Sequence, residues 1–236
     1  MIRVSASAFD ILWQDLGHAR VPVPLDVRGV GGTAAERAEI REAVYENLAE
    51  RGLATAGRAG STLSSRLETL ADADVYVECE ALVSLDDETP LRAVAAAGGR
   101  RAVLAAQPSR TIGLSAIRDA ELFPAIVGLL PPFDAGPGFG VSVPSSALEG
   151  KASDAVAKQL AEIRAIQARP VLGAGQFSVR VRENGRVRRV GGVSWFTTGA
   201  GAYCGMVAPG RGGEDWLTLI PADPARLAAR LAELLD

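Results

Sequence analysis

The sequence predicts an α+β fold with a pseudo-twofold repeat, because one order of elements occurs twice. Strand-like residues 75–117 precede a helical pattern at 123–130, and strand-like residues 176–220 precede a helical pattern at 224–235. Further helical patterns come before the first block and between the two blocks. Helices placed around runs of antiparallel strands are typical of an α+β protein, and a doubly wound parallel sheet fits this order less well.

Length and composition predict one globular domain. At 236 residues and 48% hydrophobic content the chain can bury a large core, so we expect a single domain, 1–236, made of two related halves of about 1–131 and 132–236. The net charge of −3 gives no long-range attraction to nucleic acid. No run is apolar for the ~20 residues that span a bilayer, and no export signal is visible. We therefore expect a cytoplasmic protein without nucleic acid or stable membrane insertion.

The N-terminal third is predicted to form an extended arm and two helices. Residues 1–12 alternate only weakly, and a Val-Pro-Val-Pro segment follows at 21–24, so we expect this arm to pack without forming a helix of any length. Thr33 and Glu36 form a capping-box pattern, which predicts an amphipathic helix over residues 34–54. After two glycines, Ser61 is predicted to cap a second helix.

The first strand block begins with a regular alternation. Apolar side chains alternate with polar ones over residues 75–85, which predicts a strand with one buried face and an acidic outer face carrying Glu78 and Glu80. Residues 101–107 and 111–117 are predicted to form a strand pair.

The second half contains the strongest local patterns. Residues 133–144 form a crossover rich in glycine and proline that ends in a short strand, and residues 151–169 have helical spacing. Asn184-Gly185 favours a tight hairpin turn. Asp223 is predicted to cap the last helix, whose first residue is Pro224.

No set of residues predicts catalysis, a cofactor or a metal site. His18 is the sole histidine, so a histidine-based catalytic set or metal cage has only one site to draw on, and a turn role is favoured. Cys79 and Cys204 lie in strand-like runs and are predicted to be buried thiols. The carboxylate pairs fall in predicted loops, where solvated charge is the usual reason, and the glycine clusters lack the strand and helix of a phosphate loop.

An arginine-rich hairpin spans residues 180–189. Its arginines could in principle contact a nucleic-acid backbone, but a solvated hairpin that faces Glu78 and Glu80 fits the net acidity of the chain better. A protein-partner surface stays open, because arginine and aromatic side chains are enriched at interfaces.

Several strings, in this order and spacing, resemble the EspG proteins over nearly the whole chain: FDILWQDLG at 9–17, LLPP at 129–132, GPG at 136–138, GAGQF at 173–177, SWFTT at 194–198 and PADP at 221–224. The family consists of cytoplasmic chaperones associated with type VII (ESX) secretion in actinobacteria. The resemblance implies a pseudo-twofold α+β fold with a central antiparallel β-sheet flanked by helical bundles. It also implies a protein that is not an enzyme and needs no ATP site.

The resemblance implies a partner as well. EspG proteins bind PE–PPE heterodimers and cap the apolar tip of the PPE helical bundle, which keeps it soluble before export. Two other functions stay open from the residues alone: a structural or regulatory module that forms a homodimer through its sheet, and an enzyme for small molecules that uses carboxylates and arginines.

If the partner groove lies between the second sheet block and the closing helix, seven side chains are candidates for partner binding. Surface or core packing explains each of them about as well, Phe196 above all. The candidates are Gln176, Ser178, Arg180, Arg182 and Phe196 on strands, and Arg226 and Arg230 on the helix.

Overall fold

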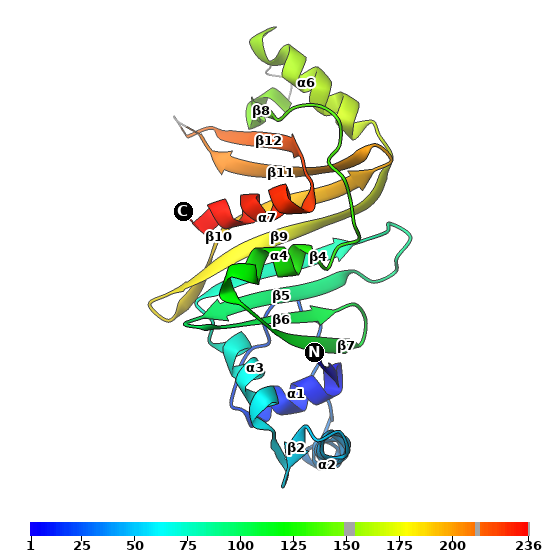
Figure 1. Ribbon diagram of the computed structural model, residues 1–236, viewed down its shortest axis with the longest axis vertical. Helices are drawn as coiled ribbons and strands as arrows, with labels where there is room; N and C mark the ends of the chain where they lie inside the picture. The colour runs from blue at the N-terminus through cyan, green and yellow to red at the C-terminus, as the bar shows by residue number, and fades with distance from the viewer. Residues whose placement is uncertain (149–153, 211–212, 236) are drawn as a thin grey trace. The chain divides into compact units, whose positions relative to one another are not determined.

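The computed structural model describes residues 1–148, 154–210 and 213–235 and has an α+β fold, as predicted (Figure 1). Ten strands form one large antiparallel sheet in the order β1-β7-β6-β5-β4-β9-β10-β11-β12-β8. The chain divides into two compact units. Unit 1 comprises Met1–Cys79, Leu91–Ile126 and Arg180–Arg189, and unit 2 comprises Glu80–Pro90, Val127–Val179 and Val190–Asp236. The pseudo-twofold repeat stays a prediction.

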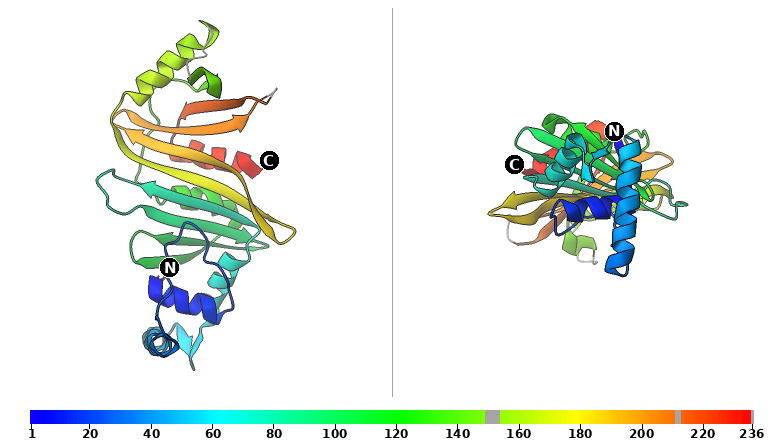
Figure 2. Two further views of the ribbon diagram at one scale, coloured as in Figure 1. Left: turned by 180° about the vertical axis from the view of Figure 1, so that it is seen from behind. Right: turned by 90° about the horizontal axis from the view of Figure 1, so that it is seen from below.

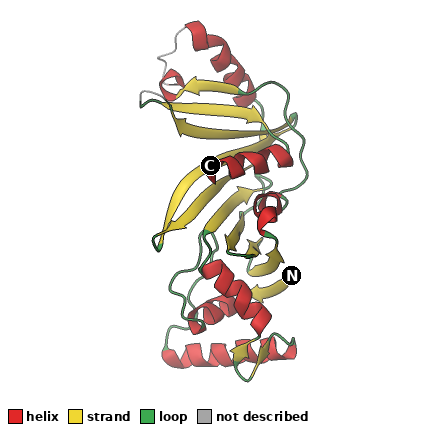
Figure 3. Ribbon diagram, turned by 60° about the vertical axis from the view of Figure 1, so that its left-hand side comes forward, coloured by secondary structure: helices red, strands yellow, loops and turns green. Residues whose placement is uncertain are grey.

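Unit 1 combines a helical end with a set of antiparallel strands (Figure 3). Its helices are α1 (Ala6–Asp15), α2 (Ala34–Glu50), α3 (Ser61–Ala71), most of α4 (Leu122–Val127) and the short 3-10 helix η1 (Asp119–Glu121). Its strands are β1 (Ile2–Ser5), the small hairpin β2 (Ala54–Thr55) and β3 (Arg58–Ala59), most of β4 (Val75–Leu82), β5 (Leu91–Gly98), β6 (Arg101–Gln107) and β7 (Thr111–Ile117).

The strands of unit 1 bury one face under α3. β5 pairs antiparallel with β6, and β6 with β7, so the predicted strand pair is confirmed. Leu63, Leu67 and Leu70 of α3 are buried in one core cluster with Val94 and Val103 of the strands. The acidic face predicted for β4 is only partly exposed, because Glu78 is half-buried beside Arg180.

Helix α1 overturns the prediction of an extended arm without a helix. Ser5 caps it by accepting a hydrogen bond from the amide of Ala8. Six consecutive residues, from Ala8 to Trp13, are buried, because the helix packs against β7 on one side and α2 on another. Six buried positions in a row leave no exposed stripe along this stretch, so exposed polar residues of the kind that mark a surface helix come only at its end, at Gln14 and Asp15.

The capping box at the start of α2 is confirmed. The Thr33 hydroxyl accepts from the Glu36 amide at 3.2 Å, and the Glu36 carboxylate accepts from the Thr33 amide at 3.1 Å. The helix ends at Glu50, a few residues before the predicted end. The prediction that Ser61 caps α3 is wrong, because Gly60 takes the extended cap conformation and Ser61 is already helical.

Unit 2 carries the second group of strands and two longer helices. Its strands are β8 (Val141–Pro144), most of β9 (Val171–Glu183), most of β10 (Arg186–Thr198), β11 (Gly201–Pro209) and β12 (Asp215–Pro221). Its helices are α5 (Ser145–Leu148), α6 (Asp154–Gln167), α7 (Pro224–Ala232) and the 3-10 helix η2 (Glu233–Leu235).

The local patterns of the second half are largely confirmed. Asn184 and Gly185 both have positive φ in the tight turn between β9 and β10. Asp223 caps α7 by accepting from the Arg226 amide, with Pro224 in the first turn. The helix predicted at 151–169 is α6, and residues 151–153 of that prediction lie outside the described residues. The helix predicted at 123–130 is α4, which is shorter than predicted. It ends at Val127, and Pro131 and Pro132 follow further along the chain.

Helices α6 and α7 of unit 2 lie on different sides of its strands. Figures 1 and 2 show α7 on one side of β10 and β11. On the other side, Leu160 and Ile163 of α6 pack with Tyr203 of β11 and Val143 of β8 in one core cluster. These helices leave part of the strand surface uncovered, since Gln176 of β9 and Ser194 of β10 are exposed.

Candidate functional site

The uncovered face of unit 2 is centred on β9 and β10. A shallow cavity of about 590 Å³ opens here, and Gln176 of β9 and Ser194 of β10 are both exposed in it. Its other walls are Glu80, Ala81 and Leu82 of β4, Asp87, Glu88 and Pro90 of the following loop, and Ala174 and Gly175 of β9. We call this surface, defined by Gln176, Ser194 and those residues, the open face.

Two glycines bring β9 against the end of β4 at the open face. A Cβ atom on Gly175 would lie 2.5 Å from the Cβ of Ala81, and one on Gly173 would lie 2.5 Å from the Val83 carbonyl oxygen. Both distances are shorter than any ordinary contact, so only glycine fits. The GAGQF string therefore has a packing reason, and it leaves a surface without bulky side chains beside Gln176.

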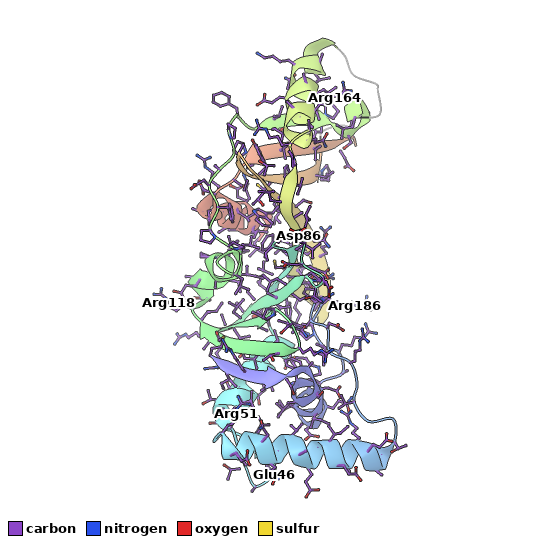
Figure 4. The ribbon with its side chains drawn as sticks, turned by 90° about the vertical axis from the view of Figure 1, so that its right-hand side faces the viewer. Glu46, Arg51, Asp86, Arg118, Arg164 and Arg186 are labelled. Carbon is purple, nitrogen blue, oxygen red and sulfur yellow. The ribbon has the colours of Figure 1, made fainter. Side chains whose placement is uncertain are left out.

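The open face has an acidic rim and an apolar end. Asp87 and Glu88 are exposed in the loop after β4, which Figure 4 marks at Asp86. The Leu85 amide donates to the Leu172 carbonyl oxygen at 2.9 Å, and these two leucine residues are 48% and 53% exposed. Exposed apolar side chains grouped at a strand end are typical of interaction surfaces.

The seven predicted partner-binding residues do not converge on one groove. Gln176 lies on the open face, and Ser178 follows it on the same face of β9. Phe196 lies two residues beyond Ser194, but it stacks on Tyr203 with ring centroids 5.5 Å apart and joins the core beneath α6. Core packing, the alternative to partner binding, therefore describes Phe196.

Arg226 and Arg230 lie on the opposite side of the strands. The register pairs Phe196 with Tyr203 and Trp195 with Cys204, and neighbouring residues of a strand point to opposite faces. Arg230 of α7 is close enough to Cys204 for its positive charge to act on that thiol.

Both α7 arginines are engaged at the surface. Arg226 is paired with Asp223 at 3.4 Å, and Arg230 with Glu233 at 2.6 Å. Exposed pairs of this kind contribute little to stability and can exchange for a partner's carboxylates. Burial raises the pKa of the Cys204 thiol to about 11, an effect that the Arg230 charge opposes. Cys204 and Cys79 are both buried.

Arg180 and Arg182 belong to unit 1 and are used within it. The Arg180 guanidinium lies 2.8 Å from the Glu78 carboxylate, the pairing expected from the sequence. Burial raises the pKa of Glu78, and the hydrogen bond and charge of Arg180 oppose that rise. Arg180 therefore serves to neutralise a half-buried carboxylate.

Arg182 closes the C-terminal end of α3. Its guanidinium donates to the carbonyl oxygens of Ala71 at 2.7 Å and Ala73 at 3.0 Å, and to the Tyr76 hydroxyl at 2.8 Å. Carbonyls at the end of a helix have no partner within the helix, so Arg182 satisfies groups that would otherwise be unpaired. Its role is structural.

Sequence reasoning missed the other residues of the open face. Ser194 and Glu80 belong to strands, and Asp87 and Glu88 belong to the acidic groups in loops for which the sequence predicts only solvated charge. The available signal was the period of two in β10, which places Ser194 on the same side as Phe196. Within residues 1–148, 154–210 and 213–235, no group of three or more possible metal ligands occurs, and no helix is long and apolar enough to cross a bilayer.

Comparison with known proteins identifies the family. The family model described as "EspG family" matches residues 5–233. The chain belongs to the EspG family. Among curated proteins, none matches the chain. Fourteen chains of solved structures match, and one of them is the Mycobacterium tuberculosis type VII secretion system chaperone EspG5, solved in complex with a PE25-PPE41 dimer.

The EspG fold extends over the whole chain. The match to EspG5 has a TM-score of 0.75 and covers 100% of this chain and 95% of the other, at 16% sequence identity. At that identity the likeness shows the fold alone.

Proposed function

We propose that this EspG-family protein is a cytoplasmic, substrate-specific chaperone of a type VII secretion system. Its substrate is a PE–PPE-like heterodimer, and it covers the apolar tip of the helical partner so that the dimer stays soluble before export. The observation that carries the proposal is the family match over residues 5–233, and the fold likeness to a chaperone solved with a PE–PPE dimer supports it.

The open face suits this task physically. A helical tip that exposes apolar side chains needs a surface with few protruding side chains and some apolar area. Gly173 and Gly175 remove side chains from β9, and Leu85 and Leu172 supply the apolar contacts at its end. The acidic rim adds a charge pattern that selects among partners.

Holding a partner needs no chemical step, so we propose that the protein is not an enzyme. Glu78, the carboxylate whose pKa is raised by burial, is engaged structurally with Arg180. Turnover of a small molecule would be the evidence for the alternative of an enzyme that uses carboxylates and arginines. Formation of a homodimer would be the evidence for the alternative of a self-associating module.

The experiment is co-expression of the full chain with candidate PE–PPE pairs, followed by size-exclusion chromatography at moderate salt. We expect a stable complex with one pair. Gln176→Arg and Ser194→Arg, which add a long charged side chain to exposed positions of the open face, should abolish its formation.

Arg226→Gln is the matched control, because Arg226 is equally exposed but lies on the α7 side. A complex that survives both substitutions on the open face and is lost with Arg226→Gln would move the binding surface to α7. A chain that elutes as a homodimer and binds no pair would favour self-association and refute the chaperone proposal.

A further inference from the structure

A second cavity of unit 2, of about 450 Å³, lies outside the open face. Its walls come from the end of β4, the start of β9, the turn that joins β10 to β11, and the segment that follows α4 (Figure 1). Its volume lies in the lower part of the ~300–1,000 Å³ range of ligand pockets. The cavity is therefore large enough for one or two side chains, but too small for a whole helix.

Backbone contacts hold the segment after α4 against β11. The Asp134 carbonyl oxygen accepts from the Ala202 amide at 2.8 Å, and the Gly136 amide donates to the Ala202 carbonyl oxygen at 2.9 Å. Gly201 has a φ of +120°, and a Cβ atom on it would lie 2.7 Å from the Ala135 carbonyl oxygen. Only glycine allows this approach. The wall of the cavity that carries Asp134 is therefore fixed by its main chain.

The rest of the cavity is mainly apolar. Phe133 packs on the buried Trp195, with ring centroids 5.5 Å apart, and Val83, Leu172 and two prolines complete the apolar walls. Leu172 also forms the apolar end of the open face with Leu85, whose amide donates to the Leu172 carbonyl oxygen. A partner that covers Leu172 on the open face therefore reaches the mouth of this cavity.

Asp134 is the one charged side chain among the described residues that line the cavity. It is exposed, and its carboxylate has no hydrogen bond or ion pair with any of residues 1–148, 154–210 and 213–235. Arg169 donates to the Tyr203 hydroxyl, which in turn donates to the Pro137 carbonyl oxygen, but none of these three residues lines the cavity. The mouth of the cavity is therefore acidic.

The neighbouring open face has the same sign of charge. Asp87 and Glu88 are exposed on its rim, and none of its described lining residues is a lysine or an arginine. Complementary charge favours the right partner across an interface and disfavours the wrong one. A partner that covers both surfaces is complementary if it presents basic side chains beside its apolar ones.

We propose that this cavity receives an apolar side chain of the PE–PPE-like substrate, and that a neighbouring lysine or arginine of the substrate pairs with Asp134. The proposal rests on the chaperone function proposed above and names the chemistry that the substrate presents at this end of the open face. The apolar side chain lies against Phe133 and Leu172, and the basic one stays at the mouth. A tip with an acidic residue at that place is repelled by Asp134.

The test uses the PE–PPE pair that forms a complex in the co-expression experiment. The purified complex is incubated with a variant chain, and mass spectrometry of the re-isolated complex gives the ratio of variant to original chain. Asp134→Asn keeps the size of the side chain and removes its charge, so it should weaken the affinity about tenfold, and Asp134→Lys should weaken it about a hundredfold. The affinity of Asp134→Asn should also depend less on salt, which a purely structural role would not alter.

Asp215→Asn is the matched control. Asp215 is also an exposed carboxylate of unit 2, but it pairs with Pro209 at the opposite end of β11 from Gly201, and its loss should leave the affinity unchanged. In a second experiment, each lysine and arginine at the tip of the PPE subunit is changed in turn to glutamate. One of these changes should weaken binding to the original chain and restore binding to Asp134→Lys.

The outcomes separate this inference from the chaperone proposal. A complex that forms equally well with Asp134→Lys would overturn the inference and leave the chaperone proposal standing. Failure of every pair to bind the original chain would overturn both. If Asp134→Lys instead breaks a homodimer of the chain, the occupant of the cavity is a second copy and the inference is wrong.

Discussion

The close approach of β9 to β4 makes Gly175→Ala a sharp test of the structure. The added Cβ would lie 2.5 Å from the Ala81 Cβ and 2.8 Å from the Glu80 carbonyl oxygen. Because these atoms belong to the backbone or to Cβ, no side-chain rotation can relieve the contact. Overpacking of a well-packed region costs about 1–3 kcal/mol, and this position belongs at the upper end.

The free energy of unfolding should fall by about 2 kcal/mol. The cost of about 3 kcal/mol is offset by up to ~1 kcal/mol, because alanine reduces the conformational entropy of the unfolded chain. With a denaturant slope of about 3 kcal/mol/M, the midpoint of urea unfolding followed by circular dichroism should fall by roughly 0.7 M.

Gly199→Ala is the control for the same chemical change. No atom lies within 4 Å of the Cβ that it adds, and Gly199 has no positive φ. Its midpoint should stay at or slightly above that of the original protein. If Gly175→Ala and Gly199→Ala unfold at the same urea concentration, the inferred strand contact is wrong.

Three further predictions concern single groups. Thr33→Ala should lower the free energy of unfolding by about 1 kcal/mol through loss of the α2 cap, whereas Thr33→Ser should keep most of it, as measured by urea unfolding. Tyr203→Phe removes the hydroxyl to which the Arg169 guanidinium donates and which itself donates to the Pro137 carbonyl oxygen. The free energy of unfolding should fall by about 1–2 kcal/mol, measured by thermal unfolding. An unchanged melting temperature would contradict this prediction. The folded-state pKa of Cys204 is raised, so its contribution to stability is complete below about 9 and is lost as pH rises toward about 11. Cys204→Ala should remove that part of the pH dependence, and a protein whose stability falls equally with and without the thiol would refute this cause.

Local signals in the sequence predicted the elements whose ends depend on neighbouring residues. The Thr33 capping box, the Asn184-Gly185 turn and the Asp223 cap each involve atoms within a few residues of one another, so tertiary contacts did not override them. Helix α1 escaped prediction for the opposite reason. Its residues from Ala8 to Trp13 are all buried, and α1 packs against β7 and α2, so this stretch has no regular change between buried and exposed positions from which a helix could be predicted.

The candidate site was less predictable, because it depends on which helix covers which face. Gln176 and Ser194 meet only through the pairing of two strands, and no local pattern reports that α6 and α7 lie on opposite sides. Arg182 is among the predicted partner-binding residues because it lies on a strand of the second block, where the partner groove is expected. Its partners are two backbone carbonyls, which any sequence could supply, and the hydroxyl of Tyr76, which lies more than a hundred residues away in the sequence, so no local pattern indicates that role.

The interleaving of the chain between its two units bears on how the protein is made. Unit 1 takes its first two segments from residues 1–126, but its third, Arg180–Arg189, is translated more than fifty residues later. At about 5–20 residues per second a ribosome needs several seconds to reach it. During that delay the end of α3 has no Arg182 and Glu78 has no Arg180, so the nascent N-terminal region exposes carbonyls and a carboxylate that the finished protein covers. A nascent chain stalled before residue 180 should therefore be digested readily by proteases, and one extended past residue 189 and clear of the ribosome should resist them.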